Sequence, residues 1–233
     1  MLEVSALDAW YGQAQILYGV SLAVGAGECV ALVGRNGAGK STTMKAIMGL
    51  IAKKRGRVVF RGHDISDLPP YRIGRLGLGW VPEDRRIFTD LTVSENLAVA
   101  RQPPRDGTPE WTPERLYALF PNLGAMPDRP GGRMSGGEQQ MLTVARTLMG
   151  NPYLVLLDEP SEGVAPLIVE EMVRMIVALK RQGVAVLLSE QNLHFARLVS
   201  DRAVVLEKGE VRFDGTMEAL MSEEGLLRTH LSL

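Results

Sequence analysis

A glycine-rich loop that begins where an apolar run ends constrains the fold of this chain more than any other segment. The loop, residues 34–41, reads Gly-Arg-Asn-Gly-Ala-Gly-Lys-Ser and directly follows the apolar run Cys29–Val33. The residues after it, 41–50, are compatible with a helix. A strand, this loop and a helix in succession are typical of a phosphate-binding loop in an α/β protein. A glycine-rich turn without a ligand is the simpler alternative, but it does not require both flanking elements.

The residues of this loop predict how phosphate is held. Its glycines let successive backbone N–H groups point inward at phosphate oxygens, and the helix N-terminus adds partial positive charge. We expect Lys40 to reach the β- and γ-phosphates and the Ser41 hydroxyl to ligate Mg²⁺. The residues predicted to contact the nucleotide here are Gly34, Arg35, Asn36, Gly37, Ala38, Gly39, Lys40, Ser41 and Thr42.

A second apolar run ends in two carboxylates. Tyr153–Leu157 lies between prolines and reads as a buried parallel strand, and Asp158 and Glu159 follow it directly. The carboxyl edge of a parallel sheet is where ligands of open α/β folds bind. We therefore expect Asp158 to hold Mg²⁺ and Glu159 to act as the base that polarises an attacking water. A solvated acidic turn is the alternative interpretation.

A third motif lies just upstream of that strand. Ser135, Gly136 and Gly137 are followed by Glu138 and two glutamines. Ser135 could simply cap a helix, but two glycines at the start of a helix cost about 1 kcal/mol each. A ligand that needs close approach to the backbone would explain them.

Together, these three motifs resemble the ATP-binding-cassette (ABC) ATPases over essentially the whole chain. The resemblance implies an α/β fold: a P-loop NTPase cassette with a RecA-like parallel-sheet core, an N-terminal antiparallel β subdomain and a helical subdomain at about 84–151, all within one domain, 1–233. It also implies ATP and Mg²⁺ as ligands. In the family, the helix that starts at the third motif caps the ATP held by the other subunit. That role is expected here for Ser135, Gly136, Gly137 and Glu138.

Other positions match the family residue by residue. Tyr11 corresponds to the aromatic that stacks on adenine, with Trp10 as a nearby competitor. Glu83 stands where most members have a Gln that senses the γ-phosphate, and it is a further candidate magnesium ligand. Gln191 stands where the family has its switch His; His194, three residues later, is better explained as a helix residue. The resemblance thus gives Lys40, Glu159 and Gln191 as catalytic residues and Ser41, Glu83 and Asp158 as metal ligands.

The departures themselves resemble one subgroup. Glu83 followed by Asp-Arg-Arg-Ile-Phe, Ala165 in the subunit-contact loop 161–166, and the Glu-Gln-Asn at 190–192 look like the second ATPase of branched-chain amino-acid importers. That subgroup includes urea and short-chain amide importers. The expected partners are a paralogous ATPase or a second copy, two membrane permeases and, indirectly, a periplasmic solute-binding protein. The expected location is peripheral, on the cytoplasmic face of the inner membrane.

Composition agrees with these expectations. Twenty-six basic and 27 acidic residues give a net charge of −1, which does not indicate electrostatic binding of nucleic acid. The single cysteine, Cys29, excludes a disulfide framework and is expected to be buried. No apolar run reaches the roughly 20 residues of a membrane span, and the N-terminus does not read as a signal peptide. We therefore expect a soluble intracellular protein.

Two other classes remain as alternatives. One is a soluble ABC ATPase that acts on ribosomes or in cluster assembly, although its ribosomal members usually carry two cassettes and basic linkers. The other is a plain P-loop kinase or GTPase, which would not need the third motif. The transported solute is not encoded in this subunit.

The remaining segments predict the order of elements. Residues 2–27 alternate apolar and polar positions, as short antiparallel strands do, and 103–107 reads as a surface loop. Further predicted elements are strands at 57–61, 76–82 and 184–189, mainly helix over 84–151, a helix at 167–181, a hairpin over 203–213 that turns at Lys208 and Gly209, and a helical tail over 215–233.

Overall fold

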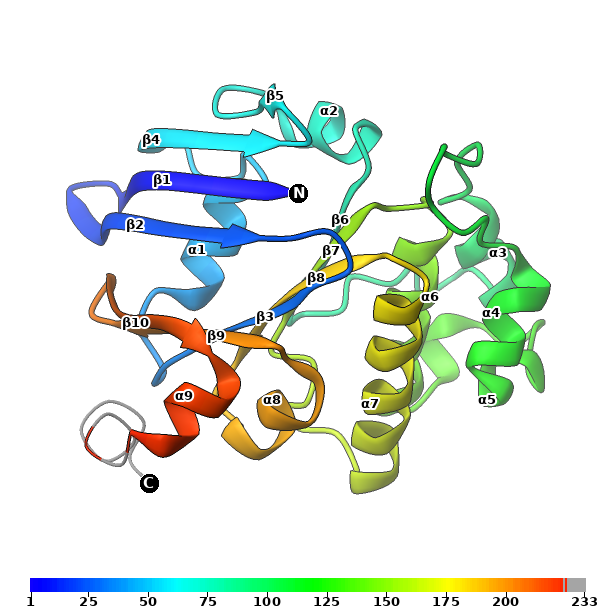
Figure 1. Ribbon diagram of the computed structural model, residues 1–233. Coiled ribbons are helices and arrows are strands. Elements are labelled where there is room, and N and C mark those ends of the chain that lie inside the picture. The colour runs from blue at the N-terminus through cyan, green and yellow to red at the C-terminus, as the bar shows by residue number, and fades with distance from the viewer. Residues whose placement is uncertain (224, 226–233) are drawn as a thin grey trace.

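The computed structural model describes residues 1–223 and 225 of the chain. Two sheets face each other with helix α1 (Lys40–Ile47) between them, and the remaining large helices cover the far side of the second sheet (Figure 1). A third region, built from short helices, lies beside the second sheet. The arrangement is the α/β cassette that the motifs predict.

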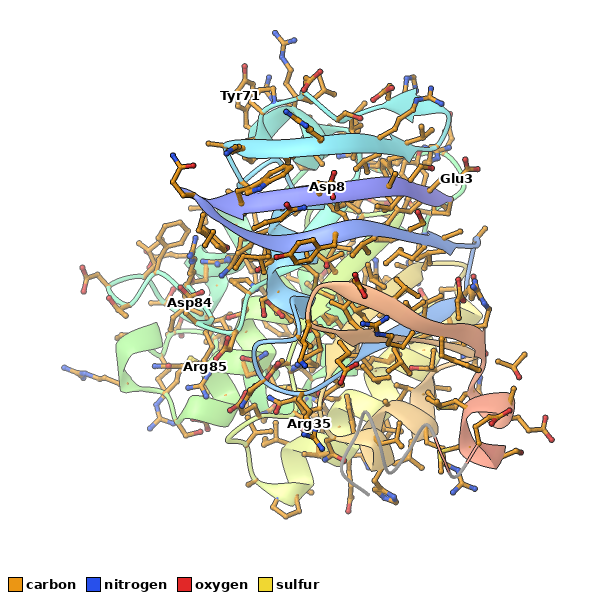
Figure 2. The ribbon with its side chains drawn as sticks, turned by 90° about the vertical axis from the view of Figure 1, so that its left-hand side faces the viewer. Glu3, Asp8, Arg35, Tyr71, Asp84 and Arg85 are labelled. Carbon is orange, nitrogen blue, oxygen red and sulfur yellow. The ribbon has the colours of Figure 1, made fainter. Side chains whose placement is uncertain are left out.

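The first sheet is antiparallel and comes mainly from the N-terminus. Its strand order is β2-β1-β4-β5, as expected from the alternating pattern of 2–27. Alternate side chains of β1 are buried, but the alternation shifts at a bulge near Ala6, where φ is 48°. Glu3 and Asp8 mark β1 in Figure 2. The strands are β1 (Leu2–Tyr11), β2 (Ala14–Val24), β4 (Lys53–Phe60) and β5 (His63–Asp64).

The second sheet has six strands in the order β10-β9-β3-β8-β7-β6. Strands β3, β7 and β8 are buried along their whole length, because helices or the other sheet cover both faces. Every neighbouring pair is parallel except β9 and β10, which form the predicted hairpin. The strands are β3 (Cys29–Val33), β6 (Leu78–Val81), β7 (Leu154–Asp158), β8 (Ala185–Glu190), β9 (Arg202–Glu207) and β10 (Glu210–Thr216).

Helices connect these strands and pack on the second sheet. Helix α7 (Pro166–Arg181) ends where predicted and starts one residue earlier, because Pro166 suits the first turn of a helix. Helix α1 ends three residues before the predicted limit, since the chain turns at Gly49, where φ is 71°. The other helices that flank the sheets are α2 (Pro70–Arg75), α8 (Leu193–Val199) and α9 (Met217–Ser222).

The region 84–151 contains less helix than predicted. Helix α6 (Gly136–Leu148) is long, but the others are short and separated by irregular chain. Prolines at 103, 104, 109, 127 and 130 explain the interruptions, because proline removes a backbone donor and restricts the preceding residue. The predicted loop at 103–107 is irregular, as expected. The short elements are α3 (Val93–Ala98), α4 (Pro113–Leu119), α5 (Pro121–Gly124) and the 3₁₀ helix η1 (Gly131–Arg133).

Three apolar clusters form the core. The first surrounds α1 between the two sheets, the second lies between the second sheet and helices α6 and α7, and the third lies under α8 and α9. Cys29 lies in this core, as predicted, and burial raises the pKa of its thiol to about 12. The predicted C-terminal helix starts at Met217, because Gly215 and Thr216 still pair with β9 as part of β10; it is present up to Ser222, and most of the rest lies outside the described residues. Across 1–223 and 225, no helix combines the length and apolar content needed to cross a membrane.

Candidate functional site

The glycine-rich loop joins β3 to α1 and forms one wall of a cavity of about 480 Å³. Gly39 has a φ of 108°, which glycine adopts readily, and a Cβ there would lie 2.8 Å from Leu17 Cδ2. A Cβ on Gly34 would overlap the carbonyl oxygen of Leu206. The glycines are thus required by close packing against β2 and β9, in addition to any role toward phosphate.

Lys40 begins α1 and is buried. Its ammonium donates to the Gly34 carbonyl oxygen at 2.9 Å and pairs with Glu159 Oε1 at 3.0 Å. The side chains of Lys40 and Glu159 are only 2% and 8% exposed. The structure therefore brings together two predicted catalytic residues that are far apart in the sequence.

Asp158 ends β7 next to α1. Its Oδ1 accepts hydrogen bonds from Ser41 Oγ at 2.9 Å and from Ser189 Oγ at 2.6 Å. Burial raises the pKa of this carboxyl, while the two hydroxyl donors act in the opposite direction. Ser41 and Asp158 thus present adjacent oxygen atoms, the ligand type that Mg²⁺ prefers.

The donor set around Asp158 fits a metal that shares its ligands with a nucleotide. Within residues 1–223 and 225, no cluster of three His, Cys, Asp or Glu side chains is arranged to hold a metal ion. Mg²⁺ in nucleotide sites usually takes one or two protein oxygens and completes its shell with phosphate and water. Ser41 and Asp158 suit that role, and Glu83 lines the same cavity from the exposed loop after β6.

Glu159 follows Asp158 in an unusual backbone conformation, with φ at 47°. Its N–H donates to the Ser189 carbonyl oxygen at 3.1 Å, and its Oε2 accepts a hydrogen bond from Gln191 Nε2 at 2.7 Å. Burial opposes its ionisation, but hydrogen bonds from Glu162, Lys40 and Gln191 outweigh this and lower its pKa. Glu159 is therefore held as a carboxylate, as a general base requires.

Glu162 is a site residue that the sequence motifs did not identify. It lines the same cavity, and its carboxyl hydrogen-bonds to Glu159. That hydrogen bond and the Glu159 charge raise the pKa of Glu162 to about 7. No sequence motif singles out Glu162, and only the fold brings its carboxyl to that of Glu159.

Tyr11 also lines the cavity, together with Ile16. It ends β1 and is 49% exposed. The competing aromatic, Trp10, contacts Lys53 and Arg55 on the outer sheet instead. Of the two candidate aromatics, Tyr11 is the one that lines the cavity. The described residues that line this cavity are Tyr11, Ile16, Asn36, Gly37, Gly39, Lys40, Ser41, Thr42, Glu83, Glu159 and Glu162.

The third motif lies apart from this cavity. Ser135 caps α6: its hydroxyl accepts from the Glu138 N–H at 3.3 Å, while Glu138 Oε2 accepts from the Ser135 N–H at 2.7 Å. A Cβ on Gly136 would lie 2.7 Å from Arg85 Nη1, and one on Gly137 would lie 2.8 Å from Ile168. Within this chain the motif thus makes a capped helix end and close packing, and it does not line the cavity that holds Lys40.

The loop after β6 connects the two regions. Arg85 and Arg86 have φ values of 61° and 52°, and α6 holds both of their carbonyl oxygens through Thr143 and Arg146. Figure 2 shows Asp84 and Arg85 where this loop approaches the helical region, with Arg35 of the phosphate loop below the first sheet. Glu83 lines the cavity at one end of this loop. The loop backbone therefore links the position of Glu83 to α6, which binds the carbonyl oxygens of Arg85 and Arg86.

Comparison with known proteins decides the family. The family model described as ABC transporter matches residues 17–162, which include the phosphate loop, the third motif and both acids. The chain belongs to the ABC transporter family. Like its ABC relatives, it is an ATP-binding ATPase whose hydrolysis is coupled to transport.

Individual ABC proteins are similar over nearly their full length. A high-affinity branched-chain amino acid transport ATP-binding protein of Pseudomonas aeruginosa, BraG, is 41% identical and covers 95% of both chains. A lipopolysaccharide export ATP-binding protein of Haemophilus influenzae, LptB, is 36% identical and covers 99% of this chain and 97% of its own. A solved ATP-binding subunit of an ABC transporter superposes with a TM-score of 0.84 at 30% identity over 100% of this chain and 96% of that one. These matches confirm the predicted family and fold.

Proposed function

We propose that this ATPase drives a membrane importer, with branched-chain amino acids as the transported solutes. The similarity to BraG over 95% of both chains carries this proposal. Glu83 and Gln191 support it, because the subgroup that the sequence resembles has Glu and Gln at these positions. Urea or short-chain amides are the alternative solutes within the same subgroup.

The cavity around Lys40 is the proposed ATP site. Tyr11 stacks on adenine, the glycine-rich loop and Lys40 bind the phosphates, and Ser41 and Asp158 hold Mg²⁺. Magnesium, when bound there, neutralises phosphate charge. Glu159 takes the proton of the attacking water, and Gln191 orients the Glu159 carboxylate through its 2.7 Å hydrogen bond.

The proposed hydrolytic unit contains two ATPase subunits. The Ser135 end of α6 lies apart from the phosphate loop of its own chain, but its N–H groups and helix charge suit a γ-phosphate. A second ATPase, paralogous or identical, would place its own phosphate loop against this end. The loop 161–165, which carries Glu162, is the proposed contact between the subunits.

A groove beside the loop 83–88 is the proposed docking site for a permease. It has a volume of about 440 Å³ and lies between the start of β6 and the end of α6. Trp80 Nε1 and Arg146 Nη1 both border it, and neither has a hydrogen-bond partner among the described residues. The proposed occupant of this groove is a cytoplasmic helix of the permease.

Transport assays test the proposed solute. The chain, its cognate permeases and a paralogous ATPase would be reconstituted in proteoliposomes, and ATP hydrolysis measured with a solute-loaded binding protein. We expect leucine or a related amino acid to stimulate hydrolysis and to accumulate in the lumen. Stimulation by urea or an amide alone would move the chain to the alternative importer class.

Lipopolysaccharide export is a second candidate function. LptB is 36% identical over almost the whole chain, so overall similarity alone separates the two transporters only modestly. The same vesicles, supplied with lipopolysaccharide instead of a loaded binding protein, address this candidate. Hydrolysis that responds to lipopolysaccharide and not to any loaded binding protein would overturn the importer assignment.

The docking proposal predicts a difference between Phe88 and Asn96. Phe88 is 51% exposed and its ring lies 4.9 Å from the Arg146 guanidinium. Asn96 is buried and hydrogen-bonds to the backbone of Phe88, Leu91 and Thr92. Phe88→Ala should keep basal hydrolysis within a few-fold but weaken its stimulation by the permeases. Asn96→Ala should lower the stability of the isolated subunit by on the order of 2–4 kcal/mol.

Basal hydrolysis, stimulated hydrolysis and thermal unfolding would be measured on the same preparations of both variants. If Phe88→Ala leaves stimulation and transport unchanged, this loop is not part of the docking surface. If Phe88→Ala instead lowers stability as much as Asn96→Ala does, the ring serves packing within the subunit.

A further inference from the structure

We propose that Glu190 is the positioning residue that fixes the loop 161–165 and the Gln191 turn as one rigid unit beside Glu159. Glu190 ends β8 and is 2% exposed. Its Oε1 accepts the Ser161 N–H at 3.1 Å, and its Oε2 accepts the N–H groups of Gln191 and Asn192, both at 3.1 Å. One buried carboxylate therefore bridges two segments that are 29 residues apart in the chain.

The neighbouring residues of β8 bind the same stretch of chain. Ser189 hydrogen-bonds to Asp158 and to the Glu159 N–H, and the Gln191 side chain hydrogen-bonds to the Glu159 carboxylate. Three consecutive residues at the end of β8 thus contact 158, 159 and 161. Within this set, Glu190 accepts three backbone N–H groups, and it is not among the residues that line the cavity.

A carboxylate is the side chain that this position requires. Three backbone N–H groups converge on it, and an ionised carboxylate offers only acceptors. An amide of the same shape has one acceptor oxygen and one NH₂ group, so one of the two segments must lose its acceptor. Burial raises the pKa of Glu190, while its hydrogen bonds from Ser161 and Asn192 favour the charged form.

The consequence concerns the proposed base. Gln191 Nε2 lies 2.7 Å from Glu159 Oε2, and the Gln191 side chain is exposed, so packing does not fix it. The backbone turn held by Glu190 is what sets its direction. The same carboxylate holds Ser161, the first residue of the loop that leads to Glu162. Movement of that loop by a second subunit therefore reaches Gln191 through Glu190. This inference rests on the proposed roles of Glu159 and Gln191.

Glu190→Gln tests the inference by kinetics. ATP hydrolysis would be measured on the full chain at high protein concentration. We expect kcat to fall about 10- to 100-fold, because small misplacements of a catalytic group cost rates of this size, while KM for ATP stays within about twofold. In a Gln191→Ala background, the same substitution should lower kcat by less than about threefold, since its effect passes through Gln191. If the decreases in kcat caused by Glu190→Gln and Gln191→Ala multiply in the double variant, the inference is wrong.

Amide hydrogen exchange gives a readout that does not depend on activity. In Glu190→Gln, the amide oxygen of the new side chain should face the two donors of the Gln191 turn, which leaves the Ser161 N–H without its acceptor. We expect Ser161 exchange to accelerate about tenfold or more, with exchange in β7 unchanged. Unchanged protection of Ser161, Gln191 and Asn192 in this variant would overturn the inference even if activity falls.

Glu28→Gln is the matched control. Glu28 also accepts a backbone N–H, that of Gly25 at 2.6 Å, and it pairs with Arg202 away from the cavity. It should alter stability without changing kcat or Ser161 exchange. Glu159→Gln distinguishes failure of the proposed base from failure of the Glu190 inference. Full activity in that variant would refute the role of Glu159 as base and leave the exchange result for Glu190 standing.

Discussion

The Lys40–Glu159 pair predicts that Glu159→Gln binds nucleotide more tightly while it hydrolyses more slowly. Lys40 Nζ and Glu159 Oε1 are 3.0 Å apart in a buried setting. Phosphate must compete with this carboxylate for the ammonium. Glutamine removes the competing charge and keeps the shape, and Lys40 retains the carbonyl oxygens of Gly34 and Arg35 as acceptors.

This geometry sets an upper limit on the effect. Two unit charges 3.0 Å apart attract by about 5–6 kcal/mol at an effective dielectric constant of about 20. Phosphate offers Lys40 a comparable attraction, so only the difference between the two reaches the affinity. We expect that difference to be about 1.4 kcal/mol, a tenfold lower Kd. Turnover should fall by about 10²–10⁴, the range for a lost general base.

Calorimetric titration with ADP and with a non-hydrolysable ATP analogue measures the affinity without turnover. Glu162→Gln at pH 8 is the control, because Glu162 lines the same cavity and is mostly ionised there but makes no ion pair with Lys40. If the nucleotide Kd falls equally in both variants, the affinity depends on the total negative charge in the cavity and not on the Lys40–Glu159 pair. A Kd for Glu159→Gln that is unchanged or higher would refute the reasoning.

Three further predictions follow from the site. Lys40→Ala should abolish both tight ATP binding and hydrolysis in equilibrium binding and phosphate-release assays, because it removes a charge-assisted phosphate contact. Gly137→Asp should leave nucleotide affinity at low protein concentration nearly intact but abolish hydrolysis at high concentration; equal losses would exclude action on a partner's ATP. The raised pKa of Glu162, about 7, means that the folded chain binds more protons than the unfolded chain between roughly pH 4.5 and 7. Its contribution to stability should therefore be lost as pH rises through 7, and Glu162→Gln should remove that loss from urea unfolding curves.

Most of the fold could be predicted because each core strand has a recognisable residue pattern within a short stretch of sequence. Strands β3, β7 and β8 are continuous apolar runs bounded by glycine, proline or acids. The N-terminal sheet shows alternation, and the hairpin of β9 and β10 shows its turn residues. Each of these signals depends on residues within a short stretch of chain, so it survives without knowledge of tertiary contacts.

The helical region was predicted less well because side chains from distant segments shape it. Asn96 holds the backbone of 88–92, and Asn151 bonds to Trp111, Gln102 and Pro103 across 40 to 49 residues. Such asparagines stabilise irregular chain by satisfying its backbone groups. Their sequence pattern does not distinguish them from asparagines on a surface loop.

The motif residues of the site were predictable, but their pairings were not. Lys40, Ser41, Asp158 and Glu159 each belong to a recognisable local motif. Glu162 and Glu190 lie in the segments 161–166 and 190–192 that carry the family resemblance, but the resemblance gave neither side chain a role. Their roles depend on the register between β7 and β8, in which Asp158 lies opposite Ser189. A shift of that register by one residue would turn every side chain to the other face and separate these groups.

If this cavity is the ATP site, the pairings among its side chains should favour the release of product. Lys40 is paired with Glu159, Ser41 with Asp158, and Glu159 with Gln191. At the proposed ATP site, a contact of phosphate or magnesium with one of these side chains would therefore replace a contact within the chain, and the affinity would be the difference between the two. When hydrolysis weakens the contacts to phosphate, the contacts between side chains of the protein re-form. A site whose charged groups lacked internal partners would hold ADP more tightly and would turn over more slowly.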